Sequence, residues 1–501
     1  MFFQPRPTLK KISILQSYIH HQIIFLPFTT NAITNQQNSH TDSPENINLI
    51  ITKVKSGTTS DQIFQSLNHD QTCNSIPISD NLLSQILNRF KDDWKSALGI
   101  FKWAIESQKC HTPLPKSHEI ILDILGKTKQ IEKMMSQLKR IHHHHRHDVT
   151  LSSIAKVMRR LCGVGKWQEA VKLFDELHTF GFEKNHESMN LLLDTLCKEN
   201  KVEQARKIFL ELKSHISPTV HTFNIFIHGW CKVNRVDEAH WTIQEMKGYG
   251  FSPSVITYST IIKSYSQNSN FGKVYELLDE MKGQNCPPNV VTFTIIMCYL
   301  TKFGEFEDAL GIPEKMKLFG CEPDTRFYNA LIHTLAKSGR VQDAINVFEF
   351  EMLKFNVPRN TSTFNSMISM FCHHGRDQDA INLLRKMGNF ENCKPDIQSF
   401  NPLLKIWFKT RKVDLWLGDL LDEMINKYQI SLDLCTYTLL IHGLCRVNRC
   451  EWAYGFFEEM IGKDITPRYY TCVLLLDEVK KMKNYDAVDC IEGYMKRMKS
   501  S

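Results

Sequence analysis

A segment of about 35 residues recurs along the chain from Pro115 nearly to its end. The copies include TFNIFIHGWCKVNRVDEA at 222–239, TFTIIMCYLTKFGEFEDA at 292–309 and TYTLLIHGLCRVNRCEWA at 436–453. In each copy a Thr-aromatic pair opens an amphipathic run, a polar bend follows, and a second run ends shortly before a proline. This pattern predicts two helices joined by a turn. Because one such pair cannot bury its own apolar face, the copies are expected to stack into an all-α solenoid with two broad surfaces.

The repeat frame divides the chain into segments. Residues 115–468 are predicted to form ten repeats, residues 78–114 a degenerate helical repeat, and residues 469–501 a terminal partial repeat or cap. The predicted starts are Pro115, Leu151, His186, Val220, Val255, Val290, Thr325, Thr361, Ile397, Leu434 and Tyr469. The repeats between Thr325 and Asp433 are one or two residues longer than 35, which we expect to change the pitch locally.

The start of the chain has a different composition. Its first 41 residues contain no Asp or Glu, and basic residues stand beside the amphipathic run LKKISILQSYIHHQIIFL at 9–26. This composition predicts an organelle transit peptide over residues 1–30, mitochondrial by its Phe and Ile content, with the chloroplast as the alternative. A disordered tail without a targeting signal is the other interpretation. Polar residues interrupt every apolar run, so no membrane span is predicted. Residues 31–77, rich in Asn, Gln, Ser and Thr, are predicted to be a disordered polar linker.

Overall composition agrees with a soluble, intracellular, helical chain. Of its 501 residues, 42% are hydrophobic and 23% charged, which is enough to bury a long core. The 15 cysteines contain no CxxC pair that would suggest zinc. Several occupy the twelfth position of their repeats, where a small side chain fits between helices, and these are interpreted as reduced core residues: Cys162, Cys197, Cys231, Cys372 and Cys445.

The fifth position of the repeat is restricted to small polar residues: Asn190, Asn224, Ser259, Thr294, Asn329, Asn365, Asn401 and Thr438. Such residues have a modest helix propensity in a helix interior, so their recurrence on one face of the helix needs an explanation. One interpretation is that the stripe is exposed to solvent and has no function, but the residues of such a stripe would vary among Glu, Lys, Gln and Ser. The tetratricopeptide repeat has a similar period, yet its Trp-Leu-Gly-Tyr spacing does not recur here.

Tyr or Phe at the fourth position, a small polar fifth residue, a Cys-Lys pair further on, and a terminal proline followed by Asp or Asn resemble the pentatricopeptide repeat. The similarity covers roughly Pro115 to Ser501 and is to the class of pure 35-residue repeats in plant organelles. It implies a right-handed α-solenoid superhelix that binds single-stranded RNA, one base per repeat. It also implies action by occupancy, in transcript stabilisation, processing, splicing or translation, together with processing or splicing proteins. No enzyme activity and no cofactor are expected.

The resemblance assigns base reading to the fifth and last residues of each repeat. A carboxylate only accepts hydrogen bonds, so Asp at the last position suits the imino N–H of guanine or uracil, whereas Asn can donate to adenine or cytosine. That Ser or Thr at the fifth position favours purine, and Asn pyrimidine, is implied by the resemblance alone. The pairs are Ser259 with Asn289 (adenine), Thr294 with Asp324 (guanine), Asn329 with Asn360 (pyrimidine), Asn365 with Asp396 and Asn401 with Asp433 (uracil), and Asn190 with Thr219 and Asn224 with Ser254 (pyrimidine).

Three repeats depart from this pattern and receive no base: Glu119 with Thr150, Ala155 with Asn185, and Thr438 with Arg468. The resemblance further implies that second-position side chains clamp each base. Ile256 and Val291 comply, Arg326 can stack on a base, and Ser362 and Gln398 suit this role poorly. The thirteenth position supplies a basic ridge for phosphate: Lys198, Lys232, Lys302, Lys337 and Lys409. A solvated ridge that complements the helix dipole is the alternative interpretation.

Other motifs fail on inspection. The HHHHRH run at 142–147 lacks a recurring Cys or carboxylate partner for a metal. GVGK at 163–166 lacks the upstream glycine of a phosphate loop, and neither His118-Glu119 nor His186-Glu187 completes HExxH. The sequence therefore predicts an RNA-binding repeat protein that is not an enzyme and has no metal site. A helical-repeat scaffold for protein partners is the alternative function.

Overall fold

The computed structural model describes residues 44–54, 57–106, 115–144, 149–388, 390 and 393–500. These residues form helices and connectors, with no strand among them. They divide into two compact units, called here the N-terminal unit, which ends at Pro287, and the C-terminal unit, which begins at Pro288. The predicted all-α class is confirmed in both.

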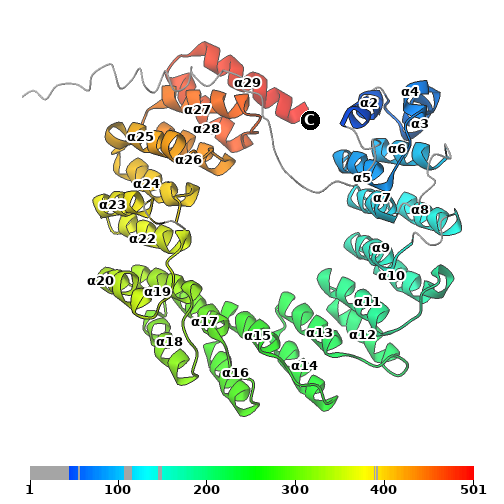
Figure 1. Cartoon of the computed structure of the whole chain (residues 1–501), viewed down its shortest axis with the longest axis horizontal. Helices are drawn as coiled ribbons and strands as arrows, with labels where there is room; N and C mark the ends of the chain where they lie inside the picture. Colours follow the sequence, from blue (N-terminus) through cyan, green and yellow to red (C-terminus); the bar gives the residue numbers. More distant parts are fainter. Residues whose placement is uncertain are drawn as a thin grey trace, which may run out of the picture. The chain divides into compact units, whose positions relative to one another are not determined.

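The N-terminal unit is a succession of paired helices (Figure 1). Its elements are α2 (Pro44–Val54), α3 (Ser60–His69), α4 (Gln71–Asn74), α5 (Asp80–Arg89), α6 (Trp94–Glu106), α7 (Pro115–Lys127), α8 (Ile131–His144), α9 (Leu151–Gly163), α10 (Trp167–Asp175) with the 3₁₀ turn η2 (Leu177–Phe180), α11 (His186–Lys198), α12 (Val202–Leu212), α13 (Val220–Lys232), α14 (Val236–Gly248), α15 (Val255–Gln267) and α16 (Phe271–Gly283).

The C-terminal unit continues the same pattern (Figure 1). Its elements are α17 (Val290–Phe303), α18 (Phe306–Leu318), α19 (Thr325–Lys337), α20 (Val341–Asn346), η3 (Val347–Glu351), α21 (Met352–Lys354), α22 (Thr361–His373), α23 (Asp377–Met387), α24 (Ile397–Thr410), α25 (Val413–Asp422), η4 (Glu423–Lys427), α26 (Leu434–Arg446), α27 (Cys450–Gly462), α28 (Tyr469–Lys481) and α29 (Tyr485–Ser500).

The first helix of each repeat begins at the residue where the predicted frame begins, from α7 at Pro115 to α28 at Tyr469. Within each unit these first helices pack side by side in chain order. In the N-terminal unit the row runs α5, α7, α9, α11, α13, α15, and in the C-terminal unit it runs α17, α19, α22, α24, α26, α28. Each unit therefore presents one continuous surface built from equivalent positions of successive repeats.

In the repeats from Val220 to Leu434, an aromatic residue at the fourth position anchors the first helix in the core. These side chains are at most 3% exposed: Phe223, Tyr258, Phe293, Tyr328, Phe364, Phe400 and Tyr437. Burying one such side chain contributes about 1.5–3 kcal/mol. The next residue, at the fifth position, lies 100° further round the helix, and so reaches the edge of the core beside the neighbouring first helix.

Two of the longer repeats have a π-helical turn in the second helix. In the repeat that begins at Thr325, α20 passes into α21 through a π-helical turn, Val347–Glu351. The repeat that begins at Ile397 has the same device at Glu423–Lys427. A π turn takes up an additional residue without breaking the helix.

The prediction of a disordered linker over residues 31–77 is wrong for Pro44–Asn74, where the structure has α2, α3 and α4. Ile47, Ile50 and Val54 are each at most 4% exposed, and α3 packs against α6. Sequence reasoning gave weight to the many Asn, Ser and Thr residues and overlooked a short apolar stripe at helical spacing. The predicted transit peptide, residues 1–30, lies outside the described residues.

Twelfth-position cysteines behave as the sequence indicates. Cys162, Cys197, Cys372 and Cys445 are buried thiols, and burial raises the pKa of each to about 12. Cys231 is half-buried, and burial raises its pKa as well. Such thiols stay protonated and unreactive at neutral pH. In the part of the chain that the structure describes, no helix has the length and apolar character needed to cross a bilayer.

Close packing between first helices depends on glycine at some tenth positions. A Cβ on Gly443 would lie 2.3 Å from Phe408 Cδ2, whereas a Cβ on Gly311, inside α18, would meet nothing within 4 Å. Gly443→Ala should therefore destabilise the protein by about 1–3 kcal/mol through overpacking. Gly311→Ala should be neutral or stabilising by up to about 1 kcal/mol, because alanine favours helix. Chemical denaturation of both variants checks this, and equal midpoints would contradict the packing argument.

Candidate functional site

The last residue of each repeat is the N-cap of the next first helix. From Thr150 to Asp433, the side chain of this residue accepts a hydrogen bond from the backbone N–H of the third residue of the following repeat, whereas Arg468 makes no such bond. The capping residues are Thr150, Asn185, Thr219, Ser254, Asn289, Asp324, Asn360, Asp396 and Asp433. Ser, Thr, Asp and Asn are the preferred N-caps. The restricted chemistry of this position thus has a structural cause that the sequence analysis did not recognise.

Capping also fixes which atom of the side chain remains for a ligand. Asn289 Oδ1 accepts from the Thr292 N–H at 3.0 Å, and Asp324 Oδ1 accepts from the Phe327 N–H at 2.8 Å. A backbone N–H can only donate, so the capping atom of an asparagine must be its oxygen. The second atom of the side chain is then Nδ2 in Asn and Oδ2 in Asp. The last position therefore offers a donor in the first case and an acceptor in the second.

Fifth and last residues meet directly in two of the predicted pairs. Asn365 Nδ2 donates to Asp396 Oδ1 at 3.0 Å, and Asn190 Nδ2 donates to Thr219 Oγ1 at 3.3 Å. The two side chains come from neighbouring first helices, so each pair lies across a repeat boundary. This arrangement places both members of a pair within reach of one ligand group.

The fifth-position side chains are not freely exposed. Asn190 is only 6% exposed, and the other members of the stripe are half-buried between neighbouring first helices. This stripe is therefore not a freely solvated face. Asn329 Oδ1 is buried and has no hydrogen-bond partner among the residues that the structure describes. Ser259 and Asn289 belong to different units, so their predicted pairing stays a prediction.

A hollow of 390 Å³ opens on the row of first helices in the C-terminal unit. Its lining includes fifth-position Asn365, second-position Ser362 and Gln398, and Lys337 of the basic ridge. Polar side chains of α19 and α22 complete the wall, among them His333, whose pKa is lowered by burial and by Lys337. Three repeat positions that the sequence assigns to one ligand thus converge on one concavity.

Second-position side chains point away from the core. Ile256 is 74% exposed and Val291 is 49% exposed, and Arg326 is exposed as well. An apolar side chain held in solvent on the surface that carries the fifth-position stripe can stack on a flat ring.

The thirteenth-position lysines are all exposed: Lys198, Lys232, Lys302, Lys337 and Lys409. Lys198 Nζ is 2.7 Å from Asp194 Oδ2, one turn earlier in the same helix. The Lys232 ammonium donates to the backbone carbonyl of Lys198, so successive ridge residues are neighbours. Lys302 lies over the rings of Tyr299 and Phe303, at 5.7 and 5.6 Å from their centroids. The predicted ridge is therefore a row of accessible cations.

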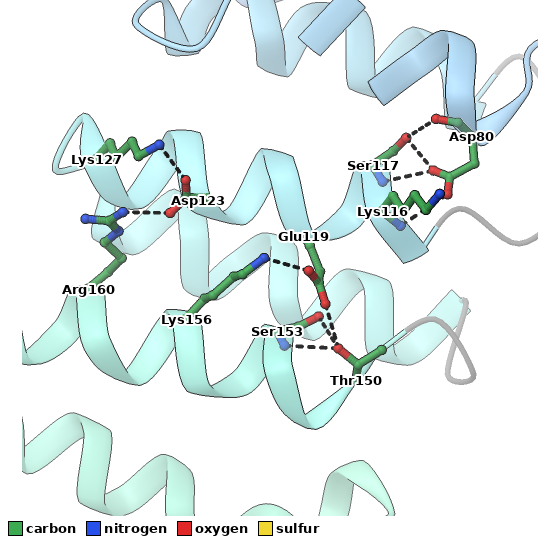
Figure 2. A network of polar contacts seen from close by, with 10 residues as sticks. All are labelled: Asp80, Lys116, Ser117, Glu119, Asp123, Lys127, Thr150, Ser153, Lys156 and Arg160. Carbon is green, nitrogen blue, oxygen red and sulfur yellow. Dashed lines mark hydrogen bonds and ion pairs between the residues drawn. The ribbon is translucent and has the colours of Figure 1, made fainter. Parts of the chain in front are cut away.

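The repeat that begins at Pro115, which received no base, is closed by ion pairs (Figure 2). Glu119 accepts from Thr150 Oγ1 at 2.9 Å and from Lys156 Nζ at 2.6 Å. Burial alone would raise the pKa of Glu119, but these two partners outweigh it and lower that pKa. Both carboxylate oxygens already accept hydrogen bonds, which distinguishes this fifth position from the neutral residues of the later repeats.

Family profiles locate the repeats independently. The PPR repeat family profile matches residues 184–229, 218–267, 253–302, 323–373 and 359–409. Profiles of the single PPR repeat match residues 429–461, 157–182 and 291–321. The chain belongs to the pentatricopeptide repeat family. The matched ranges agree with the helix pairs of the two units.

Similar proteins cover nearly the whole length of this pentatricopeptide repeat chain. A mitochondrial pentatricopeptide repeat-containing protein of Arabidopsis thaliana is 49% identical over 495 residues, 98% of this chain and 96% of the relative. A second mitochondrial family member from the same plant is 49% identical over 416 residues, 82% of this chain and 73% of the relative. The crystal structure of maize PPR10 in complex with an 18-nt psaJ RNA element is 17% identical, with a TM-score of 0.50, and covers 90% of this chain and 74% of that one.

Third-position hydroxyl groups that contact a fifth-position asparagine are a part of the site that the sequence analysis missed. They stand between the last and fifth positions in space, as in Ser399, whose hydroxyl donates to Asn365 Oδ1 at 2.6 Å. The signal was present in the sequence, because a Ser or Thr three residues after most caps is the spacing of a capping box. The structure shows such boxes at Asn185, Thr219, Ser254, Asn360 and Asp396.

The capping role predicts how Asp324 tolerates substitution. Asp324→Ala should destabilise the protein by about 0.5–2 kcal/mol, because the Phe327 N–H loses its acceptor. Asp324→Asn should change stability by only a few tenths of a kcal/mol, since asparagine caps equally well. Thermal unfolding of the two variants measures the difference. Equal losses in both would show that the carboxylate, rather than the cap, stabilises this helix.

Proposed function

We propose that this protein binds single-stranded RNA in mitochondria and acts by occupying a transcript. The observation that carries the proposal is the hollow shared by Asn365, Ser362, Gln398 and Lys337. It brings a hydrogen-bonding group, two polar second-position side chains and a cation together from three successive repeats. A nucleotide requires a hydrogen-bonding group for its base edge and a cation for its phosphate.

The relatives support both parts of the proposal. Two proteins that are each 49% identical carry mitochondrial names. PPR10, which shares the fold, was crystallised with an RNA element. Mitochondrial residence also agrees with the predicted transit peptide at residues 1–30, and the class of pure 35-residue repeats agrees with the ten predicted frames.

Base selection depends on the side-chain atom of the last residue that is not engaged in the helix cap. Asp324 uses Oδ1 for the cap, so Oδ2 remains as an acceptor for the imino N–H of guanine. Asn360 uses Oδ1 for the Thr363 N–H, so Nδ2 remains as a donor for a bare ring nitrogen. The cap thus supports the predicted difference between Asp and Asn repeats.

Binding of this kind affects a transcript without the protein catalysing a reaction. A bound solenoid blocks an exonuclease, holds a leader open for translation, or recruits a processing or splicing protein. A scaffold for peptides is the competing function, and it predicts RNA binding without base preference.

The predicted target is 5′-(C/U)-(C/U)-A-G-(C/U)-U-U-3′, read by the repeats from His186 to Asp433. Replacing AG with CC should weaken binding at least tenfold, because one well-placed base contact discriminates by about 1–3 kcal/mol. Filter binding or fluorescence anisotropy on the two RNAs measures this ratio. Equal affinities would refute base reading and favour the scaffold.

A reversal serves as the control for this experiment. Asp324→Asn keeps the cap but exchanges the remaining acceptor for a donor. The preference at the fourth nucleotide should move from guanine toward adenine while the other nucleotides keep theirs. A uniform loss of affinity would show that Asp324 has only a structural role.

The exposed ridge predicts a salt effect. Changing Lys232, Lys302 and Lys337 together to Gln should weaken binding to every RNA and flatten the logarithmic salt slope by about 0.7 per lost contact. The fold should persist, because all three side chains are exposed. Titrations at several salt concentrations provide the slope, and an unchanged slope would assign the ridge to solvation.

A further inference from the structure

We propose that a third-position hydroxyl group that reaches the fifth-position asparagine of the preceding repeat orients that asparagine and so makes it a hydrogen-bond donor toward the base. This inference rests on the proposed RNA binding and deepens it. Third-position residues then act as positioning residues for base choice, in addition to the fifth and last residues.

The contact recurs along both units. The hydroxyl of a third-position residue donates to Oδ1 of the preceding fifth-position asparagine, as in Thr222 to Asn190 at 2.7 Å and Thr257 to Asn224 at 2.9 Å. Ser399 to Asn365 is 2.6 Å, and Thr436 to Asn401 is 3.5 Å. The degenerate repeat has a related contact, because Ser84, the fifth residue of α5, lies 3.2 Å from the Ser117 hydroxyl.

The capping box fixes the direction of this hydrogen bond. Thr257 Oγ1 accepts from the Ser254 N–H at 3.3 Å, and Thr222 Oγ1 accepts from the Thr219 N–H at 3.0 Å. A hydroxyl has a single hydrogen, which remains available to donate to the asparagine oxygen. With Oδ1 engaged, the amide Nδ2 is the group left for a ligand. The fifth-position asparagine is thereby a fixed donor.

A fixed donor selects pyrimidines. Beside its ring nitrogen, a pyrimidine presents the O2 acceptor, whereas guanine presents the N2 amino donor and adenine has neither. The preference of asparagine for pyrimidines, which the resemblance only implied, thus gains a physical reason.

In the repeat that begins at Val290, the fifth residue is an acceptor rather than a donor. Its fifth residue, Thr294, donates its hydroxyl hydrogen to Val290 O at 2.7 Å within its own helix. The third position of the next repeat is Phe327, which has no hydroxyl to offer. Thr294 Oγ1 therefore keeps only its lone pairs for a ligand and accepts. With Asp324 as a second acceptor, this repeat matches the N2 amino group and imino N–H of guanine.

The second exception supports the same rule. In the repeat that begins at Leu434, Thr438 donates to Leu434 O at 2.7 Å, and the Thr471 hydroxyl lies 3.1 Å from His442 Nε2. The third-position hydroxyl is engaged elsewhere, and the fifth residue is again a threonine bonded to its own helix.

The test uses the full chain with Thr257→Val, which removes the hydroxyl and keeps the shape. RNAs that differ only at the second nucleotide are compared as C against A and as U against G. Each comparison keeps the ring-nitrogen edge the same, so it isolates Asn224. The pyrimidine preference should fall about 2- to 10-fold, the value of one hydrogen bond, while preferences at other nucleotides stay unchanged.

Two further variants make the result specific. Thr257→Ser keeps the hydroxyl and should retain the preference. Thr363→Val is the matched control, because the Thr363 hydroxyl joins the capping box of Asn360 and donates to Asn360 Oδ1. It should lower the melting temperature as Thr257→Val does, without changing any base preference. If Thr257→Val does not fold, Thr222→Val tests the same contact at Asn190 and the first nucleotide.

The outcomes separate the two proposals. A wild-type protein that prefers pyrimidine at the second nucleotide, together with a Thr257→Val variant that keeps the full preference, overturns the positioning role alone. A wild-type protein without preference at any nucleotide overturns the proposed function, and the positioning role with it. Loss of preference in Thr363→Val as well would assign the effect to helix capping rather than to the asparagine contact.

Discussion

The first turn of each first helix has backbone N–H groups without a partner inside the helix, and neighbouring helices shield them from water. Leaving such a group unsatisfied costs about 1–3 kcal/mol. The last residue of the preceding repeat meets this demand by capping, as Asn289 and Asp324 do. Because every repeat has the same helix start, the demand recurs with the same period. The side chain that meets it is therefore held at the same place on every repeat.

This constraint joins stability to recognition in one residue. A capping Asn or Asp uses one of its two polar side-chain atoms on the helix and keeps the other for a ligand. In the Asn365 and Asp396 pair the two side chains already share a hydrogen bond. Exchange of Asp for Asn preserves the cap and changes only the outer atom. Such a position can vary its ligand chemistry with little cost in stability.

Sequence periodicity located the repeat starts to the residue, because the Thr-aromatic pair marks both the cap and the core anchor. It failed where the pattern was short, at Pro44–Asn74, since Ile47, Ile50 and Val54 form one stripe within a polar composition. The candidate positions were also found from the sequence, as stripes of restricted chemistry. The hydrogen bonds between these positions could not be predicted, because the direction in which a hydroxyl such as that of Thr257 donates depends on the capping box and the neighbouring helix together. A contact between side chains 33 residues apart is invisible until the repeats are stacked.

Some lysines of the basic ridge already have partners within the protein, and these partners would compete with phosphate. Lys198 pairs with Asp194, yet the side chains of the two are 56% and 28% exposed. A solvent-exposed ion pair of this kind contributes about 0–1 kcal/mol. A phosphate that carries a full charge and releases condensed counterions competes effectively with so weak a partner. In the proposed complex, the intrahelical acid therefore does not withhold the lysine from a polyanion.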